Sequence, residues 1–154
     1  MKKHIKSFSI SVILIAVICT VLWIGYVGFI GGPARAYERE DQLYVETMME
    51  QKGYSHGRIL GRFAYEQVYY ITEITEEDRT FIFWFNKDMD TTGEHENVGF
   101  DPVLEIASNF GIKDHEISFG VFNERLVYVL KNRQYEKFID VETLKLVYDR
   151  GSGI

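Results

Sequence analysis

The strongest concentration of side chains that could bind a metal ion is the acidic stretch 88–96, Asp-Met-Asp-Thr-Thr-Gly-Glu-His-Glu. When it is aligned with a calcium-binding loop, positions 1, 3, 5 and 6 are Asp88, Asp90, Thr92 and Gly93. Position 12 is then Gly99, although tight calcium binding needs a bidentate glutamate there. His95 lies between two glutamates, but adjacent side chains of an extended segment point to opposite sides. The sequence therefore predicts a solvated acidic loop, with no metal ion and no other cofactor.

Nucleophilic catalysis would need a serine or cysteine with a histidine and a carboxylate. After residue 30 the histidines are His56, His95 and His115, and the serines nearest to them are Ser55 and Ser118. Both serines lie in or beside predicted strands, outside a nucleophile elbow, and no serine belongs to a Ser-x-x-Lys motif. A wall hydrolase that uses a pair among the 23 acidic residues stays open as the weakest hypothesis. We therefore expect a protein that is not an enzyme, and we assign no catalytic residue.

The densest aromatic group is Phe-Ile-Phe-Trp-Phe at 81–85. An exposed strand of this composition would pair with other chains and aggregate, so we predict a strand that is buried on at least one face. The alternative is a hydrophobic groove for a partner protein. Trp84 and Tyr128 are the residues that we select as a candidate partner surface.

Two helices and seven strands would position these side chains. The first helix, 34–52, has Tyr37, Tyr44, Val45 and Met48 on one face, and Gly53 follows it. The second begins at Asp101-Pro102, and Gly111 follows its apolar stripe of Val103, Ile106, Ala107 and Phe110. Alternating apolar, β-branched and aromatic residues predict strands at 58–65, 68–75, 80–85, 116–122, 125–131, 135–141 and 144–148. A loop is expected at 86–99, and a two-residue hairpin turn at Asn123-Glu124.

One helix followed by several strands thus occurs twice, in units that we place at 34–99 and 100–150. Helices and strands do not alternate as a parallel βαβ sheet requires. The sequence therefore predicts an α+β fold of two units, each a helix on an antiparallel sheet of three or four strands.

Residues 10–30 form an uncharged apolar run. As a helix, it would measure roughly 32 Å at about 1.5 Å per residue, enough for a hydrocarbon core of about 30 Å. We therefore predict a transmembrane signal anchor, represented by Ile10, Leu14, Val17, Val21, Trp23, Val27 and Ile30. Lys2, Lys3 and Lys6 lie before it, so the positive-inside rule places segment 1–9 in the cytoplasm and the rest outside the cell. A cleaved signal peptide is the alternative, because Ala34-Arg35-Ala36 is a small-x-small pattern.

Charge and cysteine content restrict the part after the apolar run. The formal net charge is −6, but all of the 23 acidic residues and 14 of the 17 basic ones follow residue 30. This region is therefore near −9, which argues against a basic face for nucleic acid or anionic lipid and favours either a partner with a basic patch or no partner. The one cysteine, Cys19, lies within the apolar run, so no disulfide is expected after it.

Two stretches carry a family resemblance. Val-Tyr-Val-Leu at 127–130 and Tyr-Glu-Lys-Phe-Ile-Asp-Val-Glu-Thr at 135–143 resemble the closing hairpin of PepSY-type domains. Glu-Gln-Val-Tyr-Tyr-Ile at 66–71 with Phe-Ile-Phe-Trp at 81–84 resembles a first copy. Together with the lysine-started apolar segment and the connecting helix, the whole chain resembles the TseB (YpmB-type) family of Gram-positive bacteria.

This resemblance implies tandem PepSY or cystatin-like units on a membrane anchor. It also implies a regulator of cell-wall elongation that contacts a penicillin-binding transpeptidase, and it transfers no catalytic residue. The alternative function is a PepSY-type peptidase inhibitor or chaperone-like module that inserts a strand edge or hairpin tip into a protease cleft.

Overall fold

The computed structural model describes the backbone of residues 2–28, 32–55, 57–77 and 79–151, and within these ranges the side chains of residues 12–28 and of residues from 37 onward. The chain divides into two units, Met1–Leu43 and Tyr44–Ile154, which are treated separately below. We call the second unit the body.

The first helix is α1 (Lys2–Tyr26). The predicted transmembrane signal anchor is wrong, because within the described residues no helix has both the length and the apolarity to cross a membrane. Of the predicted anchor residues, Leu14, Val17, Val21, Trp23 and Val27 are exposed, whereas the side chain of Ile10 and all of Ile30 lie outside the described residues.

Helix α2 (Gly32–Lys52) enters the body with its C-terminal half. There Val45, Met48 and Met49 are buried, whereas Tyr37, predicted on the same face, is 66% exposed in the first unit. The helix ends as predicted at Gly53, whose φ of +75° favours glycine. The amide of Gly53 donates to the carbonyl of Glu50, and that of Tyr54 donates to Met49, the two bonds of a Schellman motif.

Sheet A follows, with β1 (Gly57–Ala64), β2 (Val68–Glu76), β3 (Arg79–Asn86) and β4 (Thr92–Glu96) antiparallel in chain order. The three predicted strands are present, but the predicted loop at 86–99 contains β4. Strand β3 is buried along its apolar stretch, as we expected for 81–85. Phe81, Phe83 and Phe85 pack with the α2 side chains, and Ile82 and Trp84 lie on the other face.

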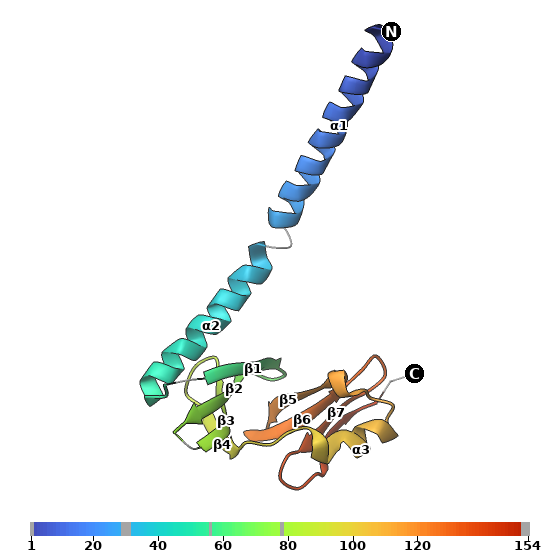
Figure 1. The fold of residues 1–154 in the computed structure, drawn as a ribbon. Helices are drawn as coiled ribbons and strands as arrows, with labels where there is room; N and C mark the ends of the chain where they lie inside the picture. Colours follow the sequence, from blue (N-terminus) through green and yellow to red (C-terminus); the bar gives the residue numbers. More distant parts are fainter. Residues whose placement is uncertain (1, 29–31, 56, 78, 152–154) are drawn as a thin grey trace. The chain divides into compact units, whose positions relative to one another are not determined.

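The second half of the body begins with α3 (Asp101–Asn109) and the short 3-10 helix η2 (Asp114–Glu116). Sheet B then contains β5 (Ile117–Phe122), β6 (Arg125–Lys131), β7 (Glu136–Asp140) and β8 (Leu146–Arg150), again antiparallel in chain order. Figure 1 shows α3 against this sheet. Val103 and Ala107 of α3 are buried in one cluster with Tyr128 of sheet B, while Ile106 and Phe110 are partly buried against it, so the predicted stripe is confirmed.

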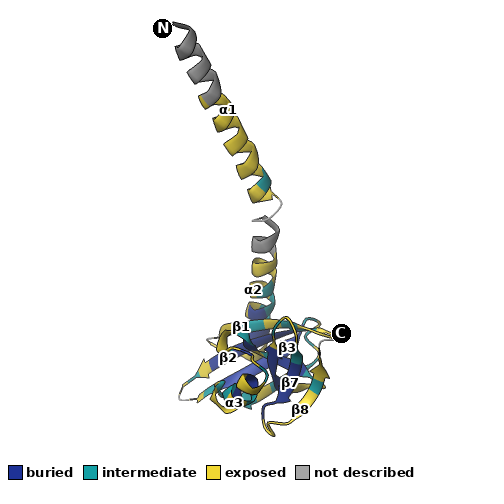
Figure 2. Cartoon of the chain, turned by 90° about the vertical axis from the view of Figure 1, so that its right-hand side faces the viewer, coloured by how far each residue is buried: buried dark blue, intermediate teal, exposed yellow. Residues whose placement is uncertain are grey.

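The two sheets share their core. Ile82 and Trp84 of sheet A lie in one apolar cluster with Leu126 and Tyr128 of sheet B, and Figure 2 shows buried residues concentrated in the strands. Beyond this cluster, the end of β1 reaches the opposite face of sheet B. There Phe63 packs edge-on against Phe138, with ring centroids 5.5 Å apart. The body is thus α+β with two four-stranded antiparallel sheets, as the sequence predicts for this part of the chain.

Candidate partner-binding site

The two residues predicted for a partner surface lie in the core. Trp84 is 6% exposed and Tyr128 is fully buried. The Tyr128 hydroxyl donates to the carbonyl of Gly99 over 2.9 Å, and burial raises the pKa of this tyrosine, with a smaller contribution from Asp101. Trp84 lies so close to Gly93 that a Cβ there would clash with the indole ring. In this structure both side chains hold elements together and offer little surface to a partner.

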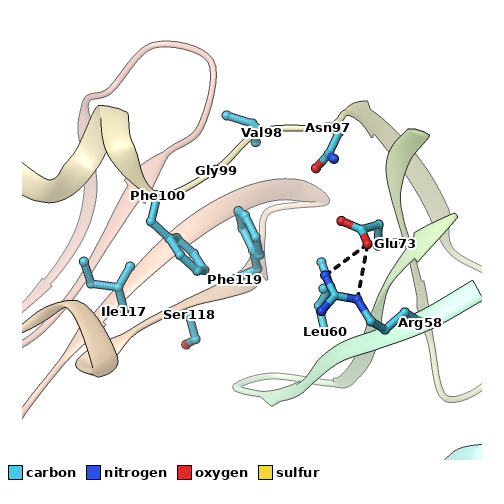
Figure 3. A pocket seen from close by; sticks show the side chains of 10 residues that line it. All are labelled: Arg58, Leu60, Glu73, Asn97, Val98, Gly99, Phe100, Ile117, Ser118 and Phe119. Carbon is cyan, nitrogen blue, oxygen red and sulfur yellow. Dashed lines mark hydrogen bonds and ion pairs between the residues drawn. The ribbon is translucent and has the colours of Figure 1, made fainter. Parts of the chain in front are cut away.

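One hollow in the described part of the body, which we call the inter-sheet pocket, has a volume of about 540 Å³. Figure 3 shows its two sides, one from sheet A and the other from β5 and the segment before α3. The volume falls within the range of about 300–1,000 Å³ that is usual for ligand sites. Its lining residues are Arg58, Leu60, Glu73, Asn97, Val98, Gly99, Phe100, Ile117, Ser118 and Phe119.

An ion pair forms the polar side of this pocket. Antiparallel pairing of β1 with β2 places Arg58 opposite Glu73. The Nε and Nη2 atoms of Arg58 donate to Oε1 of Glu73 over 3.2 and 3.0 Å. Because the Arg58 side chain is 71% exposed and that of Glu73 is 23% exposed, this pair contributes little to stability. The pair can contribute more to ligand recognition, because it places a hydrogen-bond donor beside an acceptor and carries no net charge as a whole.

Two phenylalanines form the apolar side. Phe100 directly precedes α3, and Phe119 comes from β5. Their ring centroids are 4.7 Å apart with an angle of 30° between the planes, and Phe119 also packs 5.6 Å from Tyr128. The bond from Tyr128 to Gly99 fixes the chain next to Phe100. These rings are partly buried and therefore preformed for contact with an apolar group.

The pocket lies between two sheet edges. Strand β1 is one of the two outer strands of sheet A and β5 is one of the two outer strands of sheet B, and β1 and β5 are in contact. They approach closely where Phe63 covers Gly120, because a Cβ on Gly120 would be 2.9 Å from the Phe63 ring. Nearer the start of each strand, Leu60 and Ser118 line the pocket. An outer strand has backbone groups without a partner strand, so this edge can accept an extended peptide.

A second hollow of about 240 Å³ lies beside Trp84 and is lined also by Glu94, His95, Glu124, Arg125, Leu126, Asp140 and Glu142. Burial alone would raise the pKa of Asp140. Hydrogen bonds from the hydroxyl and amide of Thr143, together with Arg125 and the amide of Glu142, outweigh that effect and hold the pKa below its ordinary value. Asp140 is therefore a structural anion that fixes the turn after β7.

The first part of the stretch that resembles a calcium loop forms a turn, and the rest of it, Thr92–Glu96, is strand β4. Oδ1 of Asn86, which is buried, accepts from the amides of Asp90 and Thr91, and its amide nitrogen donates to Oδ1 of Asp90 over 2.6 Å. His95 is bonded through Nδ1 to the carbonyl of Glu96. Among the residues that the structure describes, no group of three His, Cys, Asp or Glu side chains is placed to hold a metal ion.

Residues 53–57 read Gly-Tyr-Ser-His-Gly and match the Gly-x-Ser-x-Gly pattern. A nucleophile elbow turns from a strand into a helix. Here helix α2 comes first and strand β1 follows, so Ser55 lies in a turn of the opposite order. Ser55 is exposed, and His56 lies outside the described residues. His115 is exposed in η2, and Ser118 lines the inter-sheet pocket.

The residues that build the inter-sheet pocket were not identified from the sequence. Arg58 and Glu73 are fifteen positions apart and meet only through the register of β1 with β2. Phe100 and Phe119 come from a connecting segment and an outer strand, and neither belongs to a recognisable motif. Comparison with family models, with curated proteins and with solved structures finds no match for this chain.

Proposed function

We propose that this chain is a non-enzymatic regulator of cell-wall elongation that acts by binding a penicillin-binding transpeptidase. The observation that supports the proposal is the duplicated order of a helix and a four-stranded antiparallel sheet. This is the tandem arrangement implied by the resemblance to the TseB family. The proposal places the body outside the cell, where transpeptidases of this class act on the wall.

A shared core supports a binding role for the pair of sheets. Side chains of both sheets belong to one buried cluster, so the two outer strands β1 and β5 are held beside each other. A rigid, preformed surface loses little conformational entropy when a partner binds. The negative charge of the region after residue 30 favours a partner surface that carries basic residues.

The proposal is tested by isolating the tagged full chain from its own cells after mild crosslinking. Mass spectrometry should then find a penicillin-binding transpeptidase enriched over a tagged control protein from the same compartment. If repeated isolations recover only abundant unrelated proteins, the proposal is wrong.

One observation favours the second candidate function, a peptidase inhibitor or chaperone-like module. The hairpin between β5 and β6 turns through Asn123 and Glu124, both exposed, with φ of +50° and +63°. This confirms the predicted two-residue turn and gives a narrow tip of the kind that can enter a protease cleft. The full chain should then slow cleavage by a secreted or membrane protease of the same organism, and unchanged rates across a panel would remove this candidate.

A further inference from the structure

We propose that the inter-sheet pocket is a peptide-binding site that takes an extended, uncharged or basic segment of the partner, with a large apolar side chain next to a backbone amide. This inference rests on the proposed function and deepens it, because it names the surface and the chemistry of the contact. The ligand class follows from the two sides of the pocket and from the edges between which it lies.

The Arg58–Glu73 pair is complementary to a peptide group of the ligand, because it offers a donor for the carbonyl oxygen and an acceptor for the N–H. A guanidinium has five N–H donors, and two of its nitrogens already bind Oε1 of Glu73. The remaining donors of Arg58 can reach a carbonyl oxygen, while Oε2 of Glu73 can accept an N–H. A free carboxylate in the ligand would instead have to compete with Glu73. The neutral pair therefore selects a peptide group over a charged end.

The apolar side of the pocket selects the peptide side chain that lies next to the bound amide. Phe100 and Phe119 offer two ring faces at a centroid distance of 4.7 Å, and Leu60 adds an aliphatic contact from β1. An apolar side chain that is buried there leaves water, and this favours binding. Figure 3 shows both phenyl rings directed toward the hollow, with the Asn97 amide across from them. That amide can donate or accept a further hydrogen bond.

The outer strands β1 and β5 favour a peptide with an extended backbone. Arg58 and Leu60 of β1 and residues 117–119 of β5 line the pocket from outer strands of the two sheets. A peptide in the extended conformation can therefore pair with an edge while alternate side chains point into the pocket. The acidic balance of the chain after residue 30 disfavours an acidic peptide and is compatible with lysines at the ends.

The probe is the capped peptide Ac-Lys-Val-Phe-Val-Lys-NH2, titrated into the ¹⁵N-labelled full chain and followed by NMR. The control peptide has glycine in place of phenylalanine. We expect saturable shifts that concentrate at residues 58–60, 73, 97–100 and 117–119, and binding at least fivefold weaker for the glycine peptide. Shifts that do not saturate at millimolar peptide, or that map elsewhere, would overturn the proposal.

Two variants make the test specific. Arg58→Ala removes an exposed side chain and should weaken peptide binding about five- to tenfold, the effect of losing one ordinary hydrogen bond at an exposed site. Arg79→Ala is the matched control, because Arg79 makes the same kind of exposed pair with Glu94, at 3.3 Å, outside the pocket. It should leave the peptide affinity within twofold. Equal losses in both variants would contradict the proposal.

The result of the peptide-binding test can be distinguished from the result of the transpeptidase isolation, which tests the proposed function. If the transpeptidase is recovered with the chain but the peptide does not bind, only the pocket assignment fails. If the peptide binds the pocket and no transpeptidase is recovered, the pocket remains and the regulator of wall elongation is wrong.

Discussion

Asp140 shows how one buried charge organises a turn. Its side chain is 5% exposed, and Oδ1 accepts from the amide and the hydroxyl of Thr143, each over 2.8 Å. The carbonyl of the same residue accepts from the amide of Leu144, and its amide donates to Lys145. The turn that leads into β8 is therefore held by both the side chain and the backbone of a single residue.

The pH dependence of stability should report on this carboxylate. The folded-state pKa of Asp140 lies below its ordinary value, so ionised Asp140 stabilises the fold fully above about pH 4 and less as the pH falls through the folded-state pKa. Asp140→Asn should lower the free energy of unfolding by about 1–3 kcal/mol at pH 7. In urea unfolding from pH 7 to pH 2, this difference should shrink at the acidic end.

Glu105→Gln is the control for that series, because Glu105 is exposed on α3. Its effect should stay within about 0.5 kcal/mol at every pH. A difference for Asp140→Asn that is the same at pH 7 and at pH 2 would contradict the assigned role of the ionised carboxylate.

Replacing Glu124 by glycine should stabilise the fold. It is exposed and has a φ of +63° in the two-residue turn between β5 and β6, where Asn-Gly is the preferred pair. Glu124→Gly should raise the free energy of unfolding by about 0.5–1 kcal/mol, measured by thermal or urea unfolding. Glu142→Gly, at an exposed turn position without positive φ, should be neutral or destabilising. Destabilisation by Glu124→Gly would show that the turn is built differently.

At the scale of elements, the contact of β1 with β5 connects the two sheets. Gly120→Ala would place a Cβ 2.5 Å from Cγ2 of Val129 and 2.9 Å from the Phe63 ring. Such overpacking should cost about 1–3 kcal/mol in urea unfolding. Gly61→Ala on β1 is the matched control, since a Cβ there would have no neighbour within 4 Å. Similar stabilities of the two variants would contradict the close packing of the sheets.

Most elements of the body could be predicted because their signals are local. Apolar periodicity and Gly53 and Gly111 bound the two helices, and the β-rich runs correspond to seven of the strands within a few residues. Strand β4 could not be found in this way, since Thr-Gly-Glu-His-Glu is polar and has a glycine. It is specified by pairing with β3 and by Trp84 against Gly93, which are tertiary contacts.

The candidate site was less predictable than the fold. Large aromatic residues attract attention as binding residues, but burial decides their role, and Trp84 and Tyr128 lie in the shared core. The pocket depends on the register of β1 with β2 and on the approach of two outer strands. The apolar run was also predicted as a membrane span, whereas no helix within the described residues is long and apolar enough to cross a membrane.

At the scale of the whole molecule, the body combines a shared core with an open edge. Two sheets that bury side chains in one cluster should unfold together, as small single domains usually do. The pocket between their outer strands then keeps its two sides at a fixed separation. This arrangement suits a surface that recognises another protein.

The central claim is that this chain binds a penicillin-binding transpeptidase directly. The most direct measurement is calorimetric titration of the purified full chain with each purified transpeptidase of the organism that carries it. We predict saturable binding to at least one of them, with Arg79→Ala binding like the unchanged protein. No heat of binding to any of these enzymes, from a chain shown to be folded, would contradict the account.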